Sequence, residues 1–197
     1  MSSANIGRMR KIIVQQWATV DNIVAEEDGG LSFVSGEPFD DNTTSPFQDS
    51  VMAFIDSVDT MILGANTYNM SVGYWPTAED QGVYGKKVNA LTKFVASTTL
   101  EEAPWGEDWP AATVTADPVA TIKDLKKKKG KDIWVWGSLT LVRSLFEAGV
   151  VDEVQMRVCP ATRGKGTRFF ESSENLEVLE ATSFETGVVL LRYAVKK

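Results

Sequence analysis

Three short segments of the sequence place small residues next to hydroxyl or amide side chains, each directly after an apolar run. They are residues 64–67 (GANT), 97–99 (STT) and 137–140 (GSLT). Glycine lets a backbone approach a ligand closely, and the free N–H groups at the start of a helix attract anions. Hydroxyl and amide groups beside them can hydrogen-bond phosphate or ribose. The repetition predicts a phosphate-bearing ligand, although a single glycine between a strand and a helix is more often only a connection.

The common sequence signatures of phosphate sites are missing. Gly164-Lys165-Gly166 has no third glycine to complete G-x-G-x-x-G. Gly85-Lys86 lacks both the upstream glycine and the hydroxyl residue of G-x-x-x-x-G-K-[ST]. The three segments therefore predict a class of ligand without naming it.

Acid–base chemistry in this chain must rely on carboxylates. The sequence has no histidine and a single cysteine, which excludes a Ser-His-Asp triad, a His-ligated zinc and an internal disulfide. We predict no metal site.

The composition predicts one globular domain. The chain has 197 residues, of which 43% are apolar, enough for a sizeable core. A net charge of −7 argues against nucleic-acid or anionic-membrane binding, which needs a basic surface. No apolar run approaches the ~20 residues of a transmembrane helix, and the lone Cys159 suits a reducing compartment, so we expect a cytoplasmic protein. Residues 1–8 are expected to be a flexible leader before a single domain, 9–197.

The apolar periodicity predicts alternating strands and helices, followed by paired strands. Expected strands are residues 11–17, 60–63, 93–96, 112–115, 132–136, 153–159, 176–181 and 188–195. Expected helices are residues 46–58 (capped by Ser45), 118–125 and 139–146, with irregular stretches at 28–44 and 66–85. This order predicts an α/β fold with a mixed, mostly parallel central sheet, an antiparallel C-terminal edge and helices on both faces. Because ligands bind outside the carboxyl ends of such strands, the three segments should meet there.

Four ordered motifs resemble the bacterial bifunctional deaminase-reductase C-terminal domain family, the reductase domain of riboflavin biosynthesis. The resemblance runs from about Met9 to Lys196. Its strongest part, residues 132–170, holds a Gly137-Ser138 turn, a strand start at 151–153 (VDE), and Pro160, Gly164 and Gly166 before Phe169. The other motifs are 19–25 (TVDNIVA), 63–70 (LGANTYNM) and 96–100 (ASTTL). The resemblance implies a three-layer, dihydrofolate-reductase-like fold.

The resemblance also implies an NAD(P)H-dependent reductase of a small heterocyclic substrate, by default the ribosylamino-pyrimidine of riboflavin biosynthesis. NADPH is the usual cofactor, with NADH as an alternative. Cofactor contacts are implied for Ala18, Gly64, Asn66, Thr67, Ser97, Thr98, Gly137, Ser138, Leu139 and Thr140. Substrate contacts are implied for Thr19 and Asp21, and the peptide between Gly137 and Ser138 is expected to be cis, as in related reductases.

Two carboxylates and two aromatic residues complete the expected site. Asp49 lies on the expected first helix, roughly where dihydrofolate reductases place their acid, so Asp49 and Asp21 are the catalytic candidates. Both residues have a structural alternative. Asp49 could only stabilise the dipole of the helix from its first turn, and Asp21 could only form the turn in which it lies. Tyr68 and Trp75 are candidates for stacking on a flat substrate, with core packing as the alternative.

The chain departs from the family pattern at positions that matter for the cofactor. Ala65 stands where the family has an arginine, no arginine occupies 97–99, Ser138 replaces the second glycine of the pair, and Asn22 replaces the glycine of the first motif. NADPH recognition generally uses a cation for the 2′-phosphate, so NADH use, weak binding or loss of cofactor binding stay open. The alternative to a reductase is a non-catalytic or cofactor-poor dimeric binding protein that keeps the fold.

A homodimer is expected through the late strands of the sheet, because family members commonly pair there. The residues expected to supply its apolar surface, or else to belong to the core, are Val154, Met156, Val158, Val188, Leu190 and Leu191.

Overall fold

An eight-stranded sheet forms the middle layer of the protein, in the order β5-β4-β3-β6-β1-β7-β10-β9. Its strands are β1 (Ile12–Thr19), β3 (Val58–Gly64), β4 (Thr92–Ala96), β5 (Thr113–Thr115), β6 (Asp132–Gly137), β7 (Glu153–Cys159), β9 (Leu176–Ser183) and β10 (Val189–Val195). The strands from β5 to β7 are parallel, and β10 pairs antiparallel with β7 and β9. The predicted mostly parallel sheet with an antiparallel C-terminal edge is confirmed.

The computed structural model describes residues 8–34, 44–171 and 173–196. Of the expected leader at 1–8, only Arg8 is among them, and its guanidinium pairs with Asp132. Residues 35–43 of the expected loop at 28–44 lie outside the described residues. Within the described ranges, no helix is long and apolar enough to cross a membrane.

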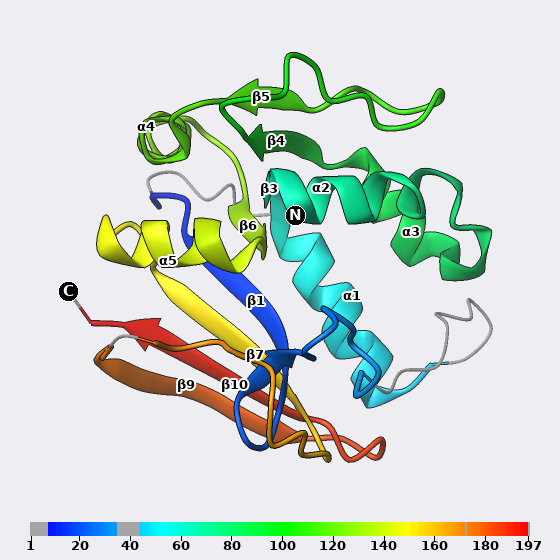
Figure 1. Ribbon diagram of the computed structural model, residues 1–197, viewed down its shortest axis with the longest axis vertical. Coiled ribbons are helices and arrows are strands. Elements are labelled where there is room, and N and C mark those ends of the chain that lie inside the picture. The colour runs from blue at the N-terminus through cyan, green and yellow to red at the C-terminus, as the bar shows by residue number, and fades with distance from the viewer. Residues whose placement is uncertain (1–7, 35–43, 172, 197) are drawn as a thin grey trace, which may run out of the picture.

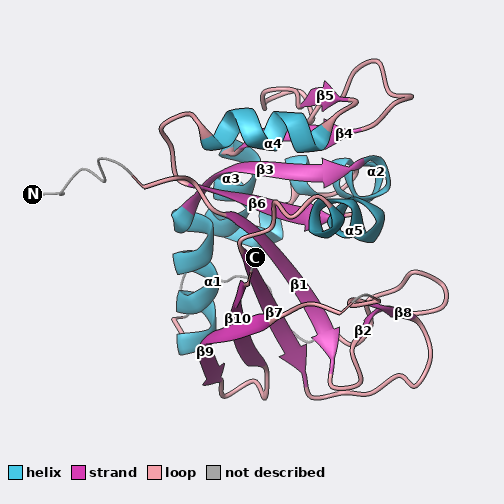
Figure 2. Cartoon of the chain, turned by 90° about the vertical axis from the view of Figure 1, so that its left-hand side faces the viewer, coloured by secondary structure: helices cyan, strands magenta, loops and turns pink. Residues whose placement is uncertain are grey.

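Helices cover both faces of the sheet, as predicted (Figures 1 and 2). They are α1 (Pro46–Ser57), α2 (Ala65–Val72), α3 (Gly82–Ala90), α4 (Pro118–Lys126) and α5 (Leu139–Glu147). One apolar core joins α1, α2 and α3 to one face, and a second joins α4 and α5 to the other. A separate small pairing links β2 (Ile23–Ala25) to β8 (Thr167–Arg168).

The local sequence signals were reliable at α1 and misleading at α2 and α3. Ser45 caps α1 by accepting the Gln48 N–H at 3.2 Å, as its spacing predicted. The prediction that residues 66–85 are irregular is wrong, because α2 and the start of α3 occupy them. Helix α2 buries only Tyr68 and Ser71, so it carries no apolar stripe from which a helix could be predicted.

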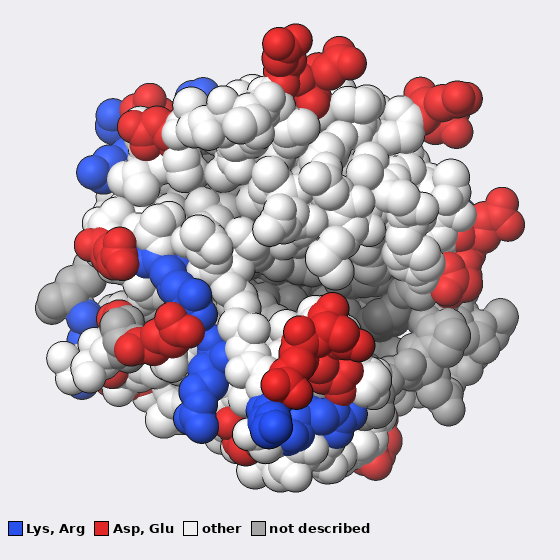
Figure 3. Space-filling model, viewed as in Figure 1, with Lys and Arg blue, Asp and Glu red and all other residues white. Residues whose placement is uncertain are grey.

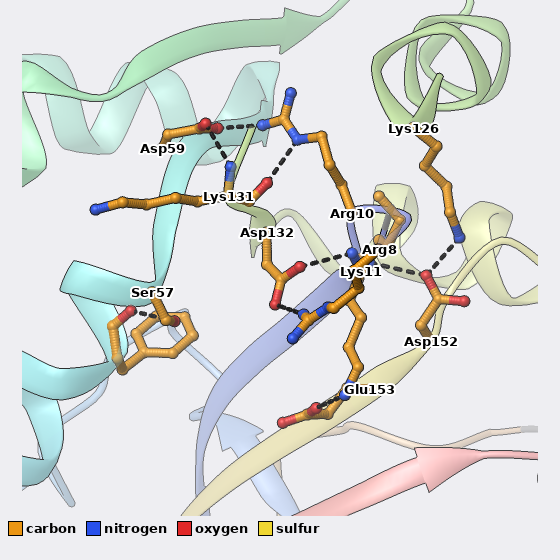
Figure 4. Close-up of polar contacts among 12 residues, drawn as sticks. Arg8, Arg10, Lys11, Ser57, Asp59, Lys126, Lys131, Asp132, Asp152 and Glu153 are labelled. Carbon is orange, nitrogen blue, oxygen red and sulfur yellow. Dashed lines mark hydrogen bonds and ion pairs between the residues drawn. The ribbon is translucent and has the colours of Figure 1, made fainter. Parts of the chain in front are cut away.

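Charged side chains tie together the amino ends of the central strands (Figure 4). Just before β1, the buried side chain of Arg10 pairs with Asp59 of β3. Asp132 of β6 and Asp152, which precedes β7, accept two backbone N–H groups at the start of β1, at 2.7 and 2.9 Å. These contacts fix the end of the sheet opposite to the carboxyl ends at which ligands bind in such folds.

The apolar residues expected to supply a dimer surface belong mostly to the core. Four of these six side chains are buried, with at most 7% of their surface exposed: Val154, Met156, Val188 and Leu190. Val154 and Met156 pack in the cluster that α4 and α5 form on one face, so the expectation of a surface role is corrected for them. The edge strand β9 instead exposes Val178 and Leu179, at 62% and 48%.

Candidate functional site

A crevice of about 370 Å³ opens where β3, β4, β5 and β6 end. Its lining residues are Gly64, Ala65, Asn66, Ala96, Ser97, Thr98, Ala116, Pro118, Ser138, Thr140, Leu141 and Ser144. Helices α2, α4 and α5 all begin at its border, so three helix N-termini face one space (Figure 1). The segments 64–67, 97–99 and 137–140 thus meet at one edge of the sheet, as the strand order predicted.

Two glycines allow the ends of β3 and β6 to approach each other. A Cβ on Gly64 would lie 2.5 Å from the Ser138 Oγ and 3.0 Å from the Ser138 backbone N. A Cβ on Gly137 would lie 2.9 Å from the Thr67 Oγ1, and Gly137 has a φ of +124°, a region that side chains rarely adopt. The peptide between Gly137 and Ser138 is cis. The two glycines therefore allow the end of β6 to pack directly against the end of β3 and the start of α2.

Six of the ten predicted cofactor residues line the crevice, and the other four do not. The lining ones are Gly64, Asn66, Ser97, Thr98, Ser138 and Thr140. Thr67 lies directly against Gly137. Leu139, between Ser138 and Thr140 in the sequence, is half-buried. Ala18 is fully buried in β1.

Sequence reasoning missed a fourth strand end that borders the same crevice. Ala116 and Pro118 follow β5 and belong to the lining. Asp117 between them caps α4 by accepting the Ala120 N–H at 2.9 Å. The strand at 112–115 and the helix start at 118 were both predicted, but this strand end was not included in the site because no glycine or hydroxyl residue directly follows it.

Comparison with known proteins assigns this arrangement to a family. The sequence model of the RibD C-terminal domain family matches residues 10–190. The chain belongs to this family. YyaP, an uncharacterized protein of Bacillus subtilis (strain 168), is 27% identical over 192 residues, which cover 94% of this chain and 95% of YyaP.

Solved structures share the fold. A candidate riboflavin biosynthesis protein from Shewanella sp. PV-4 superposes with a TM-score of 0.71 at 24% identity, covering 95% of this chain and 99% of that one. A pyrimidine reductase-like protein from Corynebacterium diphtheriae gives a TM-score of 0.66 at 15% identity, covering 95% and 92%. The RibD C-terminal domain assignment and the dihydrofolate-reductase-like fold implied by the sequence motifs are confirmed.

In this RibD C-terminal domain, Thr19 and Asp21 build the turn that follows β1. The Thr19 hydroxyl donates to the Asp21 carboxylate at 2.5 Å and accepts the Ile23 N–H at 2.9 Å. Asp21 also accepts the Gly164 N–H at 2.7 Å, which joins the turn to the glycine-containing loop after β7. The hydrogen bond from Thr19, followed by that from Gly164, holds the pKa of Asp21 at about 2, below its ordinary 3.8. Asp21 is therefore ionised at neutral pH and is a weak proton donor there.

Asp21→Asn is expected to destabilise the protein at neutral pH, because the amide cannot accept the same set of charge-assisted hydrogen bonds. Because the folded-state pKa lies below the ordinary value, the contribution of Asp21 is present above about pH 4 and disappears as the pH falls toward its pKa of about 2. Urea unfolding midpoints of both proteins across this range check the prediction, with the exposed Asp108→Asn as the control. A difference between Asp21→Asn and the parent that persists unchanged at low pH would contradict it.

The structure separates the other predicted site residues by exposure. Asp49 is exposed in the first turn of α1. Tyr68 is 5% exposed and donates its hydroxyl to the Pro104 carbonyl at 2.6 Å, so its ring packs as core. Trp75 is half-buried, with its ring centroid 5.2 Å from that of Trp136 at the end of β6. The catalytic roles of Asp49 and Asp21 stay predictions, and Trp75 keeps the exposure that stacking on a ligand requires.

Arg157 of β7 is a buried cation that sequence reasoning did not single out. It is 1% exposed, and its guanidinium carbon lies 5.9 Å from the Trp17 ring centroid and 5.6 Å from that of Phe47. Nη1 donates to the Ser50 Oγ at 3.1 Å, whereas Nη2 has no hydrogen-bond partner. Among the described carboxylates, none forms an ion pair with it. Burial lowers the pKa of Arg157 to about 10, opposed by the charges of Tyr84 and Glu180.

Arg157→Met is expected to leave the free energy of unfolding unchanged or to raise it by about 1–2 kcal/mol, because the apolar side chain removes a desolvated charge while keeping similar volume. Chemical denaturation of both proteins measures the difference. Ser50→Ala, which deletes the one hydrogen-bonding side chain, is the companion variant and should lower stability. A large loss of stability in Arg157→Met would show that the guanidinium is a structural necessity.

Proposed function

We propose that this RibD C-terminal domain is an NAD(P)H-dependent reductase of a small heterocyclic substrate. The observation that carries the proposal is the crevice bordered by the N-termini of α2 and α5 and lined by hydroxyl-bearing strand ends. Helix N-termini bind phosphate through free N–H groups and the positive end of the helix dipole. When bound, a reduced pyridine nucleotide supplies the hydride.

The residues of the crevice fit the diphosphate part of such a cofactor. Gly64 and Gly137 let the turn that opens α5 pack directly against β3 and α2, which positions Ser138 and Thr140 at the crevice. Ser138 and Thr140 at the start of α5, with Asn66 at the start of α2, would hold it by hydrogen bonds. Ser97 would face the adenosine ribose; its Oγ accepts the Thr99 and Leu100 N–H groups at 3.2 and 3.0 Å, which fixes its position.

The substrate side of the proposed site lies toward the end of β1 and α1. Trp75 offers a half-exposed ring for a flat heterocycle. Arg157 is buried beneath Trp17 and Phe47, so we assign it no contact with the substrate. The proton that must follow the hydride would come from water, with the exposed Asp49 as the candidate that orients this water.

Nucleotide binding and turnover test the proposal in two steps. Titration of the protein with NADPH and with NADH, followed by energy transfer from tryptophan to the reduced nicotinamide, should show saturable binding of at least one nucleotide. Loss of nicotinamide absorbance with 5-amino-6-(5-phosphoribosylamino)uracil or dihydrofolate then tests reduction. Saturable binding of a nucleotide together with turnover of either compound supports the proposal. Failure of both nucleotides to bind contradicts it.

A non-catalytic binding protein with the same fold is the second candidate. Ala65 and the absence of arginine at 97–99 favour it, because they remove cations that the family pattern contains. The Gly137-Ser138 turn, which places Ser138 and Thr140 in the lining of the crevice, favours the reductase. Nucleotide binding without reduction of any tested heterocycle would support this second candidate.

We also propose that the protein forms a homodimer in the cytoplasm. The edge strand β9 supports the dimer, because an edge strand with exposed apolar side chains such as Val178 and Leu179 offers a surface for pairing. The lone, buried Cys159 suits a reducing compartment. Sedimentation equilibrium of the protein and of a Val178→Lys, Leu179→Lys variant tests the dimer: the parent should have twice the monomer mass, and the variant the monomer mass.

A further inference from the structure

The charge of the crevice distinguishes between the two reduced pyridine nucleotides. NADPH differs from NADH by a phosphate on the adenosine ribose, which carries about −1.5 to −2 charges at neutral pH. Proteins that select it usually provide arginine, whose planar donors bind phosphate in pairs. The following inference rests on the proposed function and concerns the ribose end of the same crevice.

Among the residues that the structure describes, no lysine or arginine lines the crevice. Ala65 opens α2 and Thr98 follows β4, and both line it with small, uncharged side chains. The hydroxyls of Ser97 and Thr98 can hydrogen-bond a ribose. Neutral donors alone do not replace the hydration of a doubly charged phosphate, so they favour a free 2′-hydroxyl.

The lysine and arginine side chains that lie near the lining residues in sequence contact other parts of the protein. Arg143 pairs with Glu171 at 2.7 Å. Lys93 is buried and donates to the Asn89 and Leu91 carbonyls at 2.5 and 2.9 Å. Lys123 lies with residues 126–129 around a different cavity, beside Arg8. Figure 3 shows the surface over α2, β4 and β5 as uncharged, with acidic side chains at its margins and basic ones only at the margin beside α4.

An acidic group stands directly beside two lining residues that follow β5. Asp117 stands between Ala116 and Pro118, both of which line the crevice. Its carboxylate would repel a phosphate on the neighbouring ribose, and the net charge of −7 adds to the repulsion. We infer that the crevice selects NADH over NADPH, with Ala65 and Thr98 as the positions that set this choice.

Dissociation constants of NADH and NADPH, measured by calorimetry at one low ionic strength, test the inference. NADH is expected to bind at least about tenfold more tightly than NADPH, a difference of about 1.4 kcal/mol. Equal or tighter binding of NADPH overturns the selectivity while leaving the proposed reductase function intact. Binding of neither nucleotide overturns both.

Cations introduced at the two positions should reverse the preference. Ala65→Arg with Thr98→Arg is expected to tighten NADPH binding at least about tenfold, with little change for NADH. Ala65→Gln with Thr98→Gln matches side-chain size without charge. Met70→Arg adds the same charge on α2 at a residue that is 69% exposed and outside the lining. A similar gain for NADPH in either control, or no gain in the double arginine variant while circular dichroism shows a folded protein, contradicts the assignment of these positions.

Discussion

Gly64→Ala is expected to weaken nucleotide binding at least about tenfold and to lower the free energy of unfolding by about 1–3 kcal/mol. The reason is the contact between two strand ends. The new Cβ would meet the Ser138 Oγ at 2.5 Å and its backbone N at 3.0 Å, so the turn that opens α5 must shift. That turn carries the N–H groups proposed to hold the diphosphate. Calorimetric titration and urea unfolding measure the two effects.

Two further variants show whether the contact with Ser138 is the cause. Gly73→Ala is the matched control, because Gly73 has an ordinary φ of −77° and open space where its Cβ would lie. It should change neither binding nor stability appreciably. Ser138→Gly should partly rescue Gly64→Ala, because it removes the nearest atom while the backbone N remains. Strictly additive effects of the two substitutions would contradict the proposed contact.

Glu153→Ala is expected to lower the free energy of unfolding by about 3–5 kcal/mol at neutral pH, because it leaves charged partners of a buried carboxylate uncompensated. Glu153 is 1% exposed. Its Oε1 accepts from the Gln155 amide at 3.0 Å and from the Arg192 Nε at 2.9 Å, and its Oε2 lies 3.2 Å from the Lys11 ammonium. Chemical denaturation of the variant and the parent measures the loss.

The effect of Glu153→Ala should depend on pH. Burial alone would raise the pKa of Glu153, but hydrogen bonds from Gln155 and Arg192 outweigh burial and lower it. A lowered folded-state pKa means that the stabilisation is present above the ordinary glutamate value of about 4.3 and is lost as the pH falls below it. Glu177→Ala, which removes an exposed partner of Lys196, is the control and should cost less than about 1 kcal/mol. Equal losses in both variants would contradict the role of burial.

The mostly parallel sheet with its antiparallel C-terminal edge and the meeting of the three segments were predictable, because both follow from the spacing of apolar residues and from the rules that connect strands and helices. Helix α1 shows why: its cap at Ser45 and its buried face obey local spacing. The crevice followed from the parallel order of β3, β4 and β6, since glycine and hydroxyl residues end these strands. The residue types at the strand ends and the parallel order of the strands both predict a site at this edge of the sheet. A prediction on which two independent signals agree is more reliable.

Arg157 and Glu153 could not be predicted as buried groups. Along β7, polar residues alternate with Val154, Met156 and Val158, a pattern typical of a strand with one face in water. The structure buries Arg157 and Glu153 as well. Their burial depends on contacts with Ser50 of α1 and Arg192 of β10, far away in sequence. No local pattern encodes such a contact.

The ion-paired amino ends of β1, β3 and β6 have an evolutionary consequence. Arg10, Asp59 and Asp132 secure the sheet at the margin opposite the crevice. Residues in the turns that line the crevice, such as Ala65 and Ser138, can therefore be substituted without destabilising the strands that precede them. A fold that is stabilised at the opposite end of its sheet can change its ligand specificity through substitutions at a few exposed positions while the fold itself is conserved.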